Sequence, residues 1–413
     1  MKTAHKSPLL NRYKKICGNK TIELLLSKAK ALSKKHIVFI SSTYEGGGVA
    51  EILNSFIRIL NDMGVNIGWR ILHGTHDFFV VTKKFHNSLQ GEKINLSDRK
   101  KKLYYETNKH FATFTHLKHD LVVVHDPQPL PLINFYKKTQ PWVFRCHIDL
   151  SNPAPNLWAY LKKYIEKYDN VVVSKSEYYK NLKTPCSIIH PAIDPLSTKN
   201  HHLSDQTIKK YLRKYDIPIN KPIISQVSRF DKWKDQPGVI KIFEKVRKKI
   251  NCSLVLLGSP ATDDPEGEMM YKKIFKKVEK SKYKSDIKII LVNSDILVNC
   301  VQRASSVIIQ KSLREGFGLV VTEALYKGTP VVASKVGGIP LQVIDGFNGF
   351  LLEPNDVAGF ANKIIMLLKD EKLRLELGQN GIEHVKNNFL ITRLILDWLN
   401  LFEKYLLHEK KAK

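Results

Sequence analysis

The feature that most limits the fold of this chain is a repeated alternation between short apolar runs and longer helix-like segments. The run His36–Ser42 indicates a buried strand, and it leads through Glu45–Gly48 into a helix-like stretch at Val49–Met63. Apolar runs without polar alternation are typical of parallel strands, whose two faces are both covered by helices. Further strand cores in the first half lie at Val65–Leu72, Leu121–Val124, Trp142–Cys146 and Val171–Ser174.

The alternation begins again after a polar break at Pro195–Ser204. The final segment, Thr392–Leu407, is amphipathic, which indicates a helix that crosses back onto the first domain. Strand cores in the second half lie at Ile223–Val227, Ser253–Leu257, Ile287–Val292, Val307–Ile309, Pro330–Ala333 and Gly349–Leu352.

The length of 413 residues fits two domains of the usual size, about 100–200 residues each. We therefore predict an α/β protein with two doubly wound, Rossmann-like domains at residues 1–200 and 201–389, and a helix at about residues 390–413 that packs on the first. In such a protein the carboxyl ends of the strands face a deep cleft, where ligands bind.

The chain carries a large positive charge, with 67 Lys and Arg against 39 Asp and Glu, or +28. Such a field could attract nucleic-acid phosphates or steer an anionic nucleotide-sugar donor, and a Lys-rich solvated surface is the plainer explanation. The sequence contains no arginine-rich tract, zinc-ligand spacing or helix-turn-helix pattern. We therefore expect no specific nucleic-acid binding, and a non-catalytic nucleic-acid-binding protein stays a distant alternative.

Cysteine usage and hydropathy bear on location. The five cysteines are few, odd in number and far apart, which favours a reducing cytosol over a disulfide framework. No apolar run approaches the roughly 18 residues that a membrane span needs, and the basic N-terminus lacks the apolar core of a secretory signal. We expect a cytoplasmic protein without integral membrane association.

A glycine run, Gly46–Gly48, lies between the first predicted strand and a helix. Gly47 and Gly48 would let backbone N–H groups approach a phosphate at the positive end of the helix dipole. The spacing does not match the dinucleotide-binding fingerprint, and a flexible turn is the alternative.

Charged residues follow a strand of the second domain at Ser228–Asp235. Arg229 could bind a diphosphate with its planar fork of donors, and Lys234 would supply a compact positive charge. An anionic leaving group needs such cations as its bond breaks. A basic surface loop is the alternative.

Two glutamates, Glu315 and Glu323, stand eight residues apart around the start of a predicted helix. Glu315 could accept hydrogen bonds from sugar hydroxyls, and Glu323 could reach a ribose diol. The spacing is common by chance, but the Gly-Phe-Gly insert makes it specific. The predicted donor-binding run therefore comprises Glu315, Gly316, Phe317, Gly318, Leu319 and Glu323.

Polar clusters follow three strands of the first domain, at His73–Asp77, His125–Pro129 and Arg145–Asp149. They suit recognition of hydroxyl groups on a small polar acceptor. His and Asp could also bind a metal, but no i,i+4 His pair or clustered ligand motif appears, so we expect none. The candidate substrate-binding residues are His76, Asp126, Arg145, His147 and Asp149.

The pair of motifs Arg229–Lys234 and Glu315–Glu323 resembles the signature of retaining GT-B glycosyltransferases of the glycogen-synthase and sucrose-synthase-like group. Longer motifs, within a similarity that runs from about residue 13 to 390, resemble the trehalose glycosyltransferring synthases. They are Glu45–Glu51, Val81–Gly91, His125–Pro129, Arg145–Asp149, Arg229–Asp231, Asp263–Gly267 and Ser312–Gly318.

The resemblance implies transfer of glucose from UDP-, ADP- or GDP-glucose to free glucose, giving α,α-trehalose with retained configuration. It makes the first domain the acceptor side and the second the donor side. Gly47 and Gly48 would approach the donor phosphates, and Arg229 and Lys234 would hold the diphosphate. No cofactor is required if these two cations neutralise the leaving group.

In the same resemblance, Glu315 contacts the donor glucose and Glu323 the ribose. His147 and Asp149, with His76 and Asp126, shape the sugar site. The implied catalytic set is Glu315, His147, Asp149, Arg229 and Lys234.

The reaction, its stereochemical route and the oligomeric state each remain open at this point. A retaining trehalose phosphorylase shares the motifs and uses glucose 1-phosphate, and another small acceptor would also fit. Retention could proceed through a covalent carboxylate ester or by front-face attack. Expected partners are small-molecule substrates, and a homodimer stays open.

Overall fold

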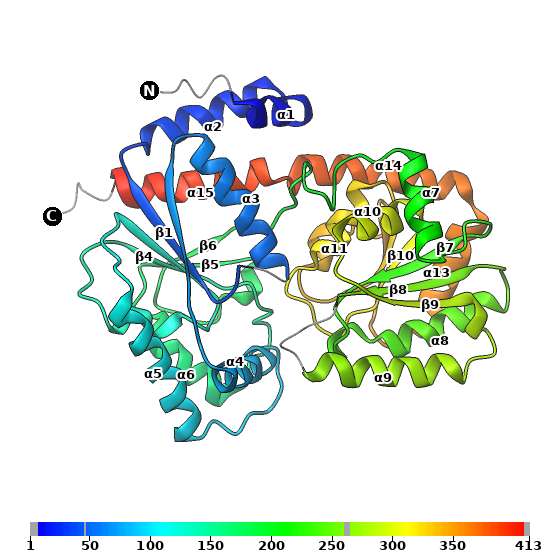
Figure 1. Ribbon diagram of the computed structural model, residues 1–413, viewed down its shortest axis with the longest axis horizontal. Coiled ribbons are helices and arrows are strands. Elements are labelled where there is room, and N and C mark those ends of the chain that lie inside the picture. The colour runs from blue at the N-terminus through cyan, green and yellow to red at the C-terminus, as the bar shows by residue number, and fades with distance from the viewer. Residues whose placement is uncertain (1–6, 45–46, 260–264, 409–413) are drawn as a thin grey trace. The chain divides into compact units, whose positions relative to one another are not determined.

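The structure, a computed structural model, describes residues 7–44, 47–259 and 265–408. The chain divides into two compact units, shown in Figure 1. Unit 1 comprises Met1–Ala192 and Ile391–Lys413, and unit 2 comprises Ile193–Leu390. None of the helices in the described ranges is long and apolar enough to cross a membrane.

Within its described residues, unit 1 is built on a six-stranded parallel sheet with the order β2-β1-β3-β4-β5-β6. The run of Leu and Val in the third strand is buried along its whole length, as expected for a strand covered on both faces. The strands are β1 (His36–Ser41), β2 (Asn66–Ile71), β3 (Leu121–His125), β4 (Trp142–Arg145), β5 (Asn170–Val173) and β6 (Cys186–Ile188).

The helices of unit 1 form where apolar residues recur every three or four positions. In the helix after β1, Leu53, Phe56 and Leu60 are buried on one face. The helices are α1 (Pro8–Cys17), α2 (Asn19–Ala31), α3 (Gly48–Asp62), α4 (His76–Leu89), α5 (Asp98–Phe114), α6 (Pro155–Ile165) and α15 (Ile391–Glu403), with short turns η2 (Leu130–Asn134), η3 (Ser176–Tyr178) and η6 (Lys404–His408).

The C-terminal helix α15 packs against α2 and α3 in unit 1. The Trp398 ring lies 5.6 Å from Phe39 of β1 and 6.1 Å from Phe56 of α3, measured between ring centroids. Lys28 of α2 forms an ion pair with Glu403 at 2.7 Å. The last helix therefore completes the core of the unit in which the chain begins.

Unit 2 repeats the architecture, again with six parallel strands among its described residues, in the order β12-β11-β10-β7-β8-β9. The strands are β7 (Ile223–Val227), β8 (Ser253–Gly258), β9 (Ile287–Leu291), β10 (Val307–Gln310), β11 (Val331–Ser334) and β12 (Gly349–Leu352). The helices are α7 (Asp205–Lys214), α8 (Gln236–Arg247), α9 (Pro265–Glu279), α10 (Asp295–Ala304), α11 (Leu319–Tyr326), α12 (Ile339–Gln342), α13 (Val357–Lys369) and α14 (Glu371–Asn388), with turns η4 (Lys232–Lys234) and η5 (Lys284–Asp286).

The predicted α/β class with doubly wound parallel sheets is confirmed, since helices cover both faces of the unit 2 sheet. On one face, Phe243 of α8 and Phe360 of α13 join a core beneath β7, β8 and β10. On the other, Leu212 of α7 and Leu297 of α10 join a second core. The pairing of β7 with β10 matters most for the site, because it brings two distant loops to neighbouring strand ends.

Residues 193–200 belong to unit 2, whereas the predicted first domain ends at residue 200. Ile193 forms a bridge with Leu390, and Lys327 donates a 2.8 Å hydrogen bond to the Asn200 side chain. The Asn299 side chain bonds the backbone oxygen of Thr198 at 3.0 Å. These contacts join residues 193–200 to unit 2, so the boundary between the units lies before residue 193 and not at residue 200.

Candidate functional site

The predicted donor-binding residues of unit 2 lie on two loops that follow adjacent parallel strands. The loop Ser228–Asp235 follows β7, and the loop Lys311–Gly318 follows β10. The carboxyl ends of parallel strands share one edge of the sheet, which is where doubly wound proteins bind ligands. The sheet order therefore brings together residues about 80 positions apart in the sequence.

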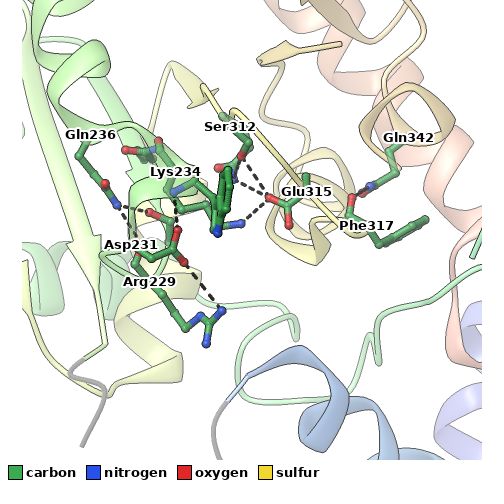
Figure 2. Close-up of polar contacts among 12 residues, drawn as sticks. Arg229, Asp231, Lys234, Gln236, Ser312, Glu315, Phe317 and Gln342 are labelled. Carbon is green, nitrogen blue, oxygen red and sulfur yellow. Dashed lines mark hydrogen bonds and ion pairs between the residues drawn. The ribbon is translucent and has the colours of Figure 1, made fainter. Parts of the chain in front are cut away.

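Glu315 is the centre of this cluster. Its Oε2 accepts hydrogen bonds from Lys234 Nζ at 2.5 Å, Ser312 Oγ at 3.1 Å and Gln310 Nε2 at 3.3 Å, and Figure 2 shows Lys234, Ser312 and Glu315 converging. The residue is 8% exposed. A carboxylate this buried needs such partners, so Lys234, Ser312 and Gln310 hold it in one place.

Arg229 differs from Lys234 in exposure. Its side chain is 48% exposed, and its Nη2 lies 3.8 Å from Asp231 Oδ2. Gln236 Nε2 bonds the backbone oxygen of Arg229 at 2.9 Å (Figure 2), so the backbone is fixed while the guanidinium reaches outward. This combination suits recognition of an anion from solution.

The turn between Glu315 and helix α11 requires glycine at one position. Gly318 has φ +86° and ψ 63°, a left-handed conformation that favours glycine. A Cβ atom there would lie 3.1 Å from Glu315 Cγ, so the missing side chain also makes room for the glutamate. Gly316 is partly buried, and Leu319 opens α11 directly after Gly318.

Phe317 is held on both its backbone and its ring. Its carbonyl oxygen accepts a 2.5 Å hydrogen bond from Gln342 Nε2, as Figure 2 shows, and its ring lies 5.7 Å from Phe389. The glycine-rich turn is therefore ordered by its neighbours.

Glu323 lies in α11 and is 1% exposed. Its Oε2 accepts a 3.1 Å hydrogen bond from Gln302 Nε2 in the interior of unit 2. The ribose contact that the resemblance implies stays a prediction.

In unit 1, three predicted residues gather at the ends of β3 and β4. The backbone N–H of His147 donates to Asp126 Oδ1 at 2.8 Å, and Arg145 Nη2 donates to Ser174 Oγ at 3.0 Å. His125 begins the predicted polar cluster His125–Pro129 but was not among the candidate substrate-binding residues, and its Nδ1 lies 3.1 Å from His147 Nε2. Its position directly before Asp126 was the available signal.

Burial sets the protonation of this cluster. It lowers the pKa of His125 to about 3 and that of His147 well below its usual value, with the Arg145 charge adding to both. Burial also raises the pKa of Asp126 to about 6, against the opposing effects of the His147 amide and Arg145. Burial lowers the pKa of Arg145 to about 10. Both imidazoles are therefore neutral at pH 7, which suits hydrogen bonding with hydroxyl groups.

The remaining predicted residues of unit 1 lie apart from this hydrogen-bonded cluster. Asp149 is 1% exposed, and its Oδ1 accepts from the Ser151 backbone at 2.8 Å, a local turn. His76 is exposed at the start of α4. Their roles toward sugar stay predictions.

Gly47 caps helix α3 with φ +84°, and Gly48 is the first residue of that helix. A Cβ atom on Gly47 would meet no atom of the described residues within 4 Å. Glu45 and Gly46 of the same motif, and Asp263 and Asp264 of the Asp263–Gly267 motif, lie outside the described residues. Across the described ranges, no group of three or more His, Cys, Asp or Glu is placed to hold a metal ion.

Comparison with known families covers both units. A model described as "Trehalose synthase, N-terminal domain" matches residues 39–180. A model described as "Glycosyl transferases group 1" matches residues 207–384. The second match contains both loops of the unit 2 cluster.

Individual relatives agree with these families. A trehalose synthase of Thermococcus litoralis is 43% identical over 96% of this chain and 97% of its own length. A trehalose phosphorylase of Pleurotus pulmonarius is 29% identical over 97% of this chain but only 61% of its own. In fold, the chain is similar to a UDP-forming α,α-trehalose-phosphate synthase from Burkholderia xenovorans, with TM-score 0.73, 15% identity, and coverage of 92% of this chain and 100% of that one.

Proposed function

Because this chain belongs to the trehalose synthase family, we propose that it transfers glucose from a nucleoside diphosphate glucose to free glucose, forming α,α-trehalose. It is a glycosyltransferase of trehalose metabolism with the GT-B fold, as predicted. The proposal adds the donor, the acceptor and the residues that bind them. The observation that carries it is the meeting of Lys234 and Glu315 in unit 2.

The donor's diphosphate would bind Arg229 and Lys234. As the bond between glucose C1 and the phosphate oxygen breaks, negative charge collects on the diphosphate, and fixed cations stabilise that charge more than they stabilise the ground state. Arg229 offers a fork of N–H donors, and Lys234 a point charge. The N-terminus of α11 adds a positive dipole beside Glu315.

Glu315 would accept hydrogen bonds from hydroxyl groups of the donor glucose. Its carboxylate is already fixed by Ser312 and Gln310, so little ordering remains to be done when the sugar arrives. Lys234 lies against the same carboxylate, so the cation proposed for the phosphate is next to the anion proposed for the sugar. A nucleotide sugar presents these two groups side by side.

For retention we favour front-face attack over a covalent ester. In this route the acceptor oxygen bonds C1 on the face that the diphosphate leaves, and the acceptor proton passes to the departing phosphate oxygen. The route needs cations at the diphosphate and no protein nucleophile. The two cations proposed for the diphosphate, Arg229 and Lys234, support this route, because they would stabilise the departing phosphate.

The acceptor glucose would be recognised by unit 1. His147 and His125 are neutral, and Asp126 accepts a hydrogen bond from the His147 backbone, so the cluster offers donors and acceptors for hydroxyl groups. We further propose a cytoplasmic location, which the unpaired state of all five cysteines supports.

Product analysis tests the function. The protein is mixed with glucose and, in separate reactions, UDP-glucose, ADP-glucose, GDP-glucose or glucose 1-phosphate, and trehalose is measured. We expect trehalose from at least one nucleotide donor and little from glucose 1-phosphate. Trehalose from glucose 1-phosphate alone would make the protein a phosphorylase and overturn the proposal.

Two variants assign the activity to the site. Glu315→Gln keeps the size of the side chain but removes its charge, and we expect it to lose most turnover. Glu376→Gln, on the exposed face of α14, is the matched control and should turn over at the wild-type rate.

A further inference from the structure

A second ion pair joins the two loops that carry the donor-binding cluster. Lys311 Nζ contacts Asp235 Oδ2, and the Lys311 side chain is 3% exposed. Asp235 follows Lys234 directly, and Lys311 begins the loop that leads to Glu315. The proposed function assigns no role to either residue of this pair.

The burial of Lys311 argues against direct contact with the donor. Lys234 is 14% exposed and Arg229 48%, whereas Lys311 is covered on all sides. Gly238 of α8 adjoins the pair, and a Cβ atom there would lie 2.9 Å from Lys311 Cε and closer still to the Asp235 carboxylate. The space around the pair is therefore fitted to these two side chains.

Asp235 holds its backbone in an unusual conformation. Its φ is +43°, in the left-handed region that residues other than glycine rarely adopt. Its Oδ1 caps α8 by accepting from the Gly238 backbone at 3.1 Å, and its Oδ2 accepts from Lys311. Both oxygens therefore fix the turn that follows Lys234.

Donor binding would affect the Lys234–Glu315 ion pair and the Lys311–Asp235 ion pair differently. In the proposed function Lys234 turns to the diphosphate and Glu315 to the sugar, so their mutual contact is exchanged for contacts with the donor. The Lys311 side chain is only 3% exposed, so the Lys311–Asp235 pair would not be exchanged for contacts with the donor. A backbone hydrogen bond from Leu313 to Trp233 at 2.7 Å runs between the same loops.

We propose that Lys311 and Asp235 are positioning residues, which keep the two loops that carry Lys234 and Glu315 at a fixed separation while the donor is bound. The inference rests on the proposed function for the roles of Lys234 and Glu315. Its physical basis is that small displacements of groups around a reacting centre are costly in rate, on the order of 100-fold for about 1 Å.

The test uses the double variant Lys311→Met/Asp235→Asn. Asn tolerates the left-handed conformation and still caps a helix, and Met fills much of the space of Lys. Removing both charges avoids leaving one buried charge without its partner. The control is Lys221→Met/Asp286→Asn, a pair that bridges the amino-terminal ends of β7 and β9 in the same sheet. Asp286 also accepts a 2.8 Å hydrogen bond from Arg247 Nε, and the Asn side chain keeps an acceptor for it.

We expect the double variant to keep a melting temperature close to that of the wild type. Its kcat/KM for the nucleotide donor should fall by about tenfold or more, through a higher KM as well as a lower kcat, because a displaced Lys234 holds the diphosphate less well both before and during bond breaking. The control should keep kcat/KM within about twofold of the wild type. Asp235→Asn alone should also lose donor kcat/KM, and it is the second variant if the double one folds poorly.

A folded double variant with wild-type donor kcat/KM would overturn the positioning role and leave the proposed function standing. If the wild type itself forms no product from any nucleotide donor, the proposed function fails separately. Calorimetry with UDP, ADP and GDP then tests the positioning of Lys234 without turnover. An affinity at least about tenfold weaker in the double variant supports the inference, and equal affinity overturns it.

Discussion

Replacing Lys234 by Met separates the contribution of the Lys234–Glu315 pair to stability from its contribution to catalysis. The two side chains are 14% and 10% exposed, and their charged atoms lie 2.5 Å apart. Met keeps the length of the side chain but not its charge. The Glu315 carboxylate then retains hydrogen bonds from Ser312 and Gln310 but loses its cation.

The stability change follows from this burial. Removing one partner of a buried ion pair typically costs about 3–5 kcal/mol, because an uncompensated charge remains. Two hydrogen bonds to Glu315 survive, so we place the loss of unfolding free energy for Lys234→Met at the lower end, about 3 kcal/mol. The double variant Lys234→Met/Glu315→Gln removes both charges and should recover most of that stability.

The catalytic change has a different origin and should not recover. Loss of a preorganised donor to a developing anion typically lowers kcat about 100- to 1,000-fold. At least this loss is expected in both Lys234→Met and the double variant, because both lack the cation at the diphosphate and the double variant also lacks the Glu315 carboxylate. Denaturant unfolding and steady-state kinetics with the preferred nucleotide glucose measure the two effects on the same samples.

The decisive comparison is between the two variants. Recovery of both stability and kcat in the double variant would mean that Lys234 serves only to neutralise Glu315. A wild-type kcat in the single variant would likewise refute the role assigned to the cation.

Three further predictions concern other parts of the site. Arg229→Ala should raise the donor KM by about tenfold and slow departure of the diphosphate, and unchanged kinetic constants would contradict this. Gly318→Ala should lower the unfolding free energy by about 1–2 kcal/mol and reduce kcat by displacing Glu315, as denaturant titration and kinetics will show. The pKa of Asp126 is raised to about 6 in the folded protein, so the folded state favours the protonated carboxyl. Asp126 therefore contributes its full share of the unfolding free energy below about pH 4, and this share is lost as the pH rises through about 6. Asn has no such titration, so the unfolding free energy of Asp126→Asn minus that of the wild type should be about 2 kcal/mol larger at pH 7 than at pH 4. If this difference between the two proteins is the same at both pH values, the reasoning is refuted.

Most of the strands could be predicted from the sequence because they are continuous apolar runs. The run Leu121–Val124 appears as β3 with all its residues buried. The strand β6 was not predicted, since Cys186–Ile188 is three residues long and only partly buried. Helix α7 was missed as well, because its sequence is mostly polar and Leu212 is its buried residue.

The residue types of the donor site could also be predicted, but their contacts could not. Lys234 and Glu315 were assigned to different parts of the donor, and their ion pair follows from the adjacency of β7 and β10, which sequence spacing does not encode. Lys311 carried no signal, because a buried lysine in a Lys-rich chain looks like any other. The burial of Glu323 against Gln302 depends on packing between α10 and α11 and was equally hidden.

The central claim is that Arg229 and Lys234 receive the negative charge of the departing diphosphate. A crystal structure of the protein with a bound nucleoside diphosphate tests it most directly. The account predicts phosphate oxygens about 3 Å from Lys234 Nζ and from the Arg229 guanidinium, with the contact between Lys234 and Glu315 lengthened. A diphosphate bound away from both residues would contradict it.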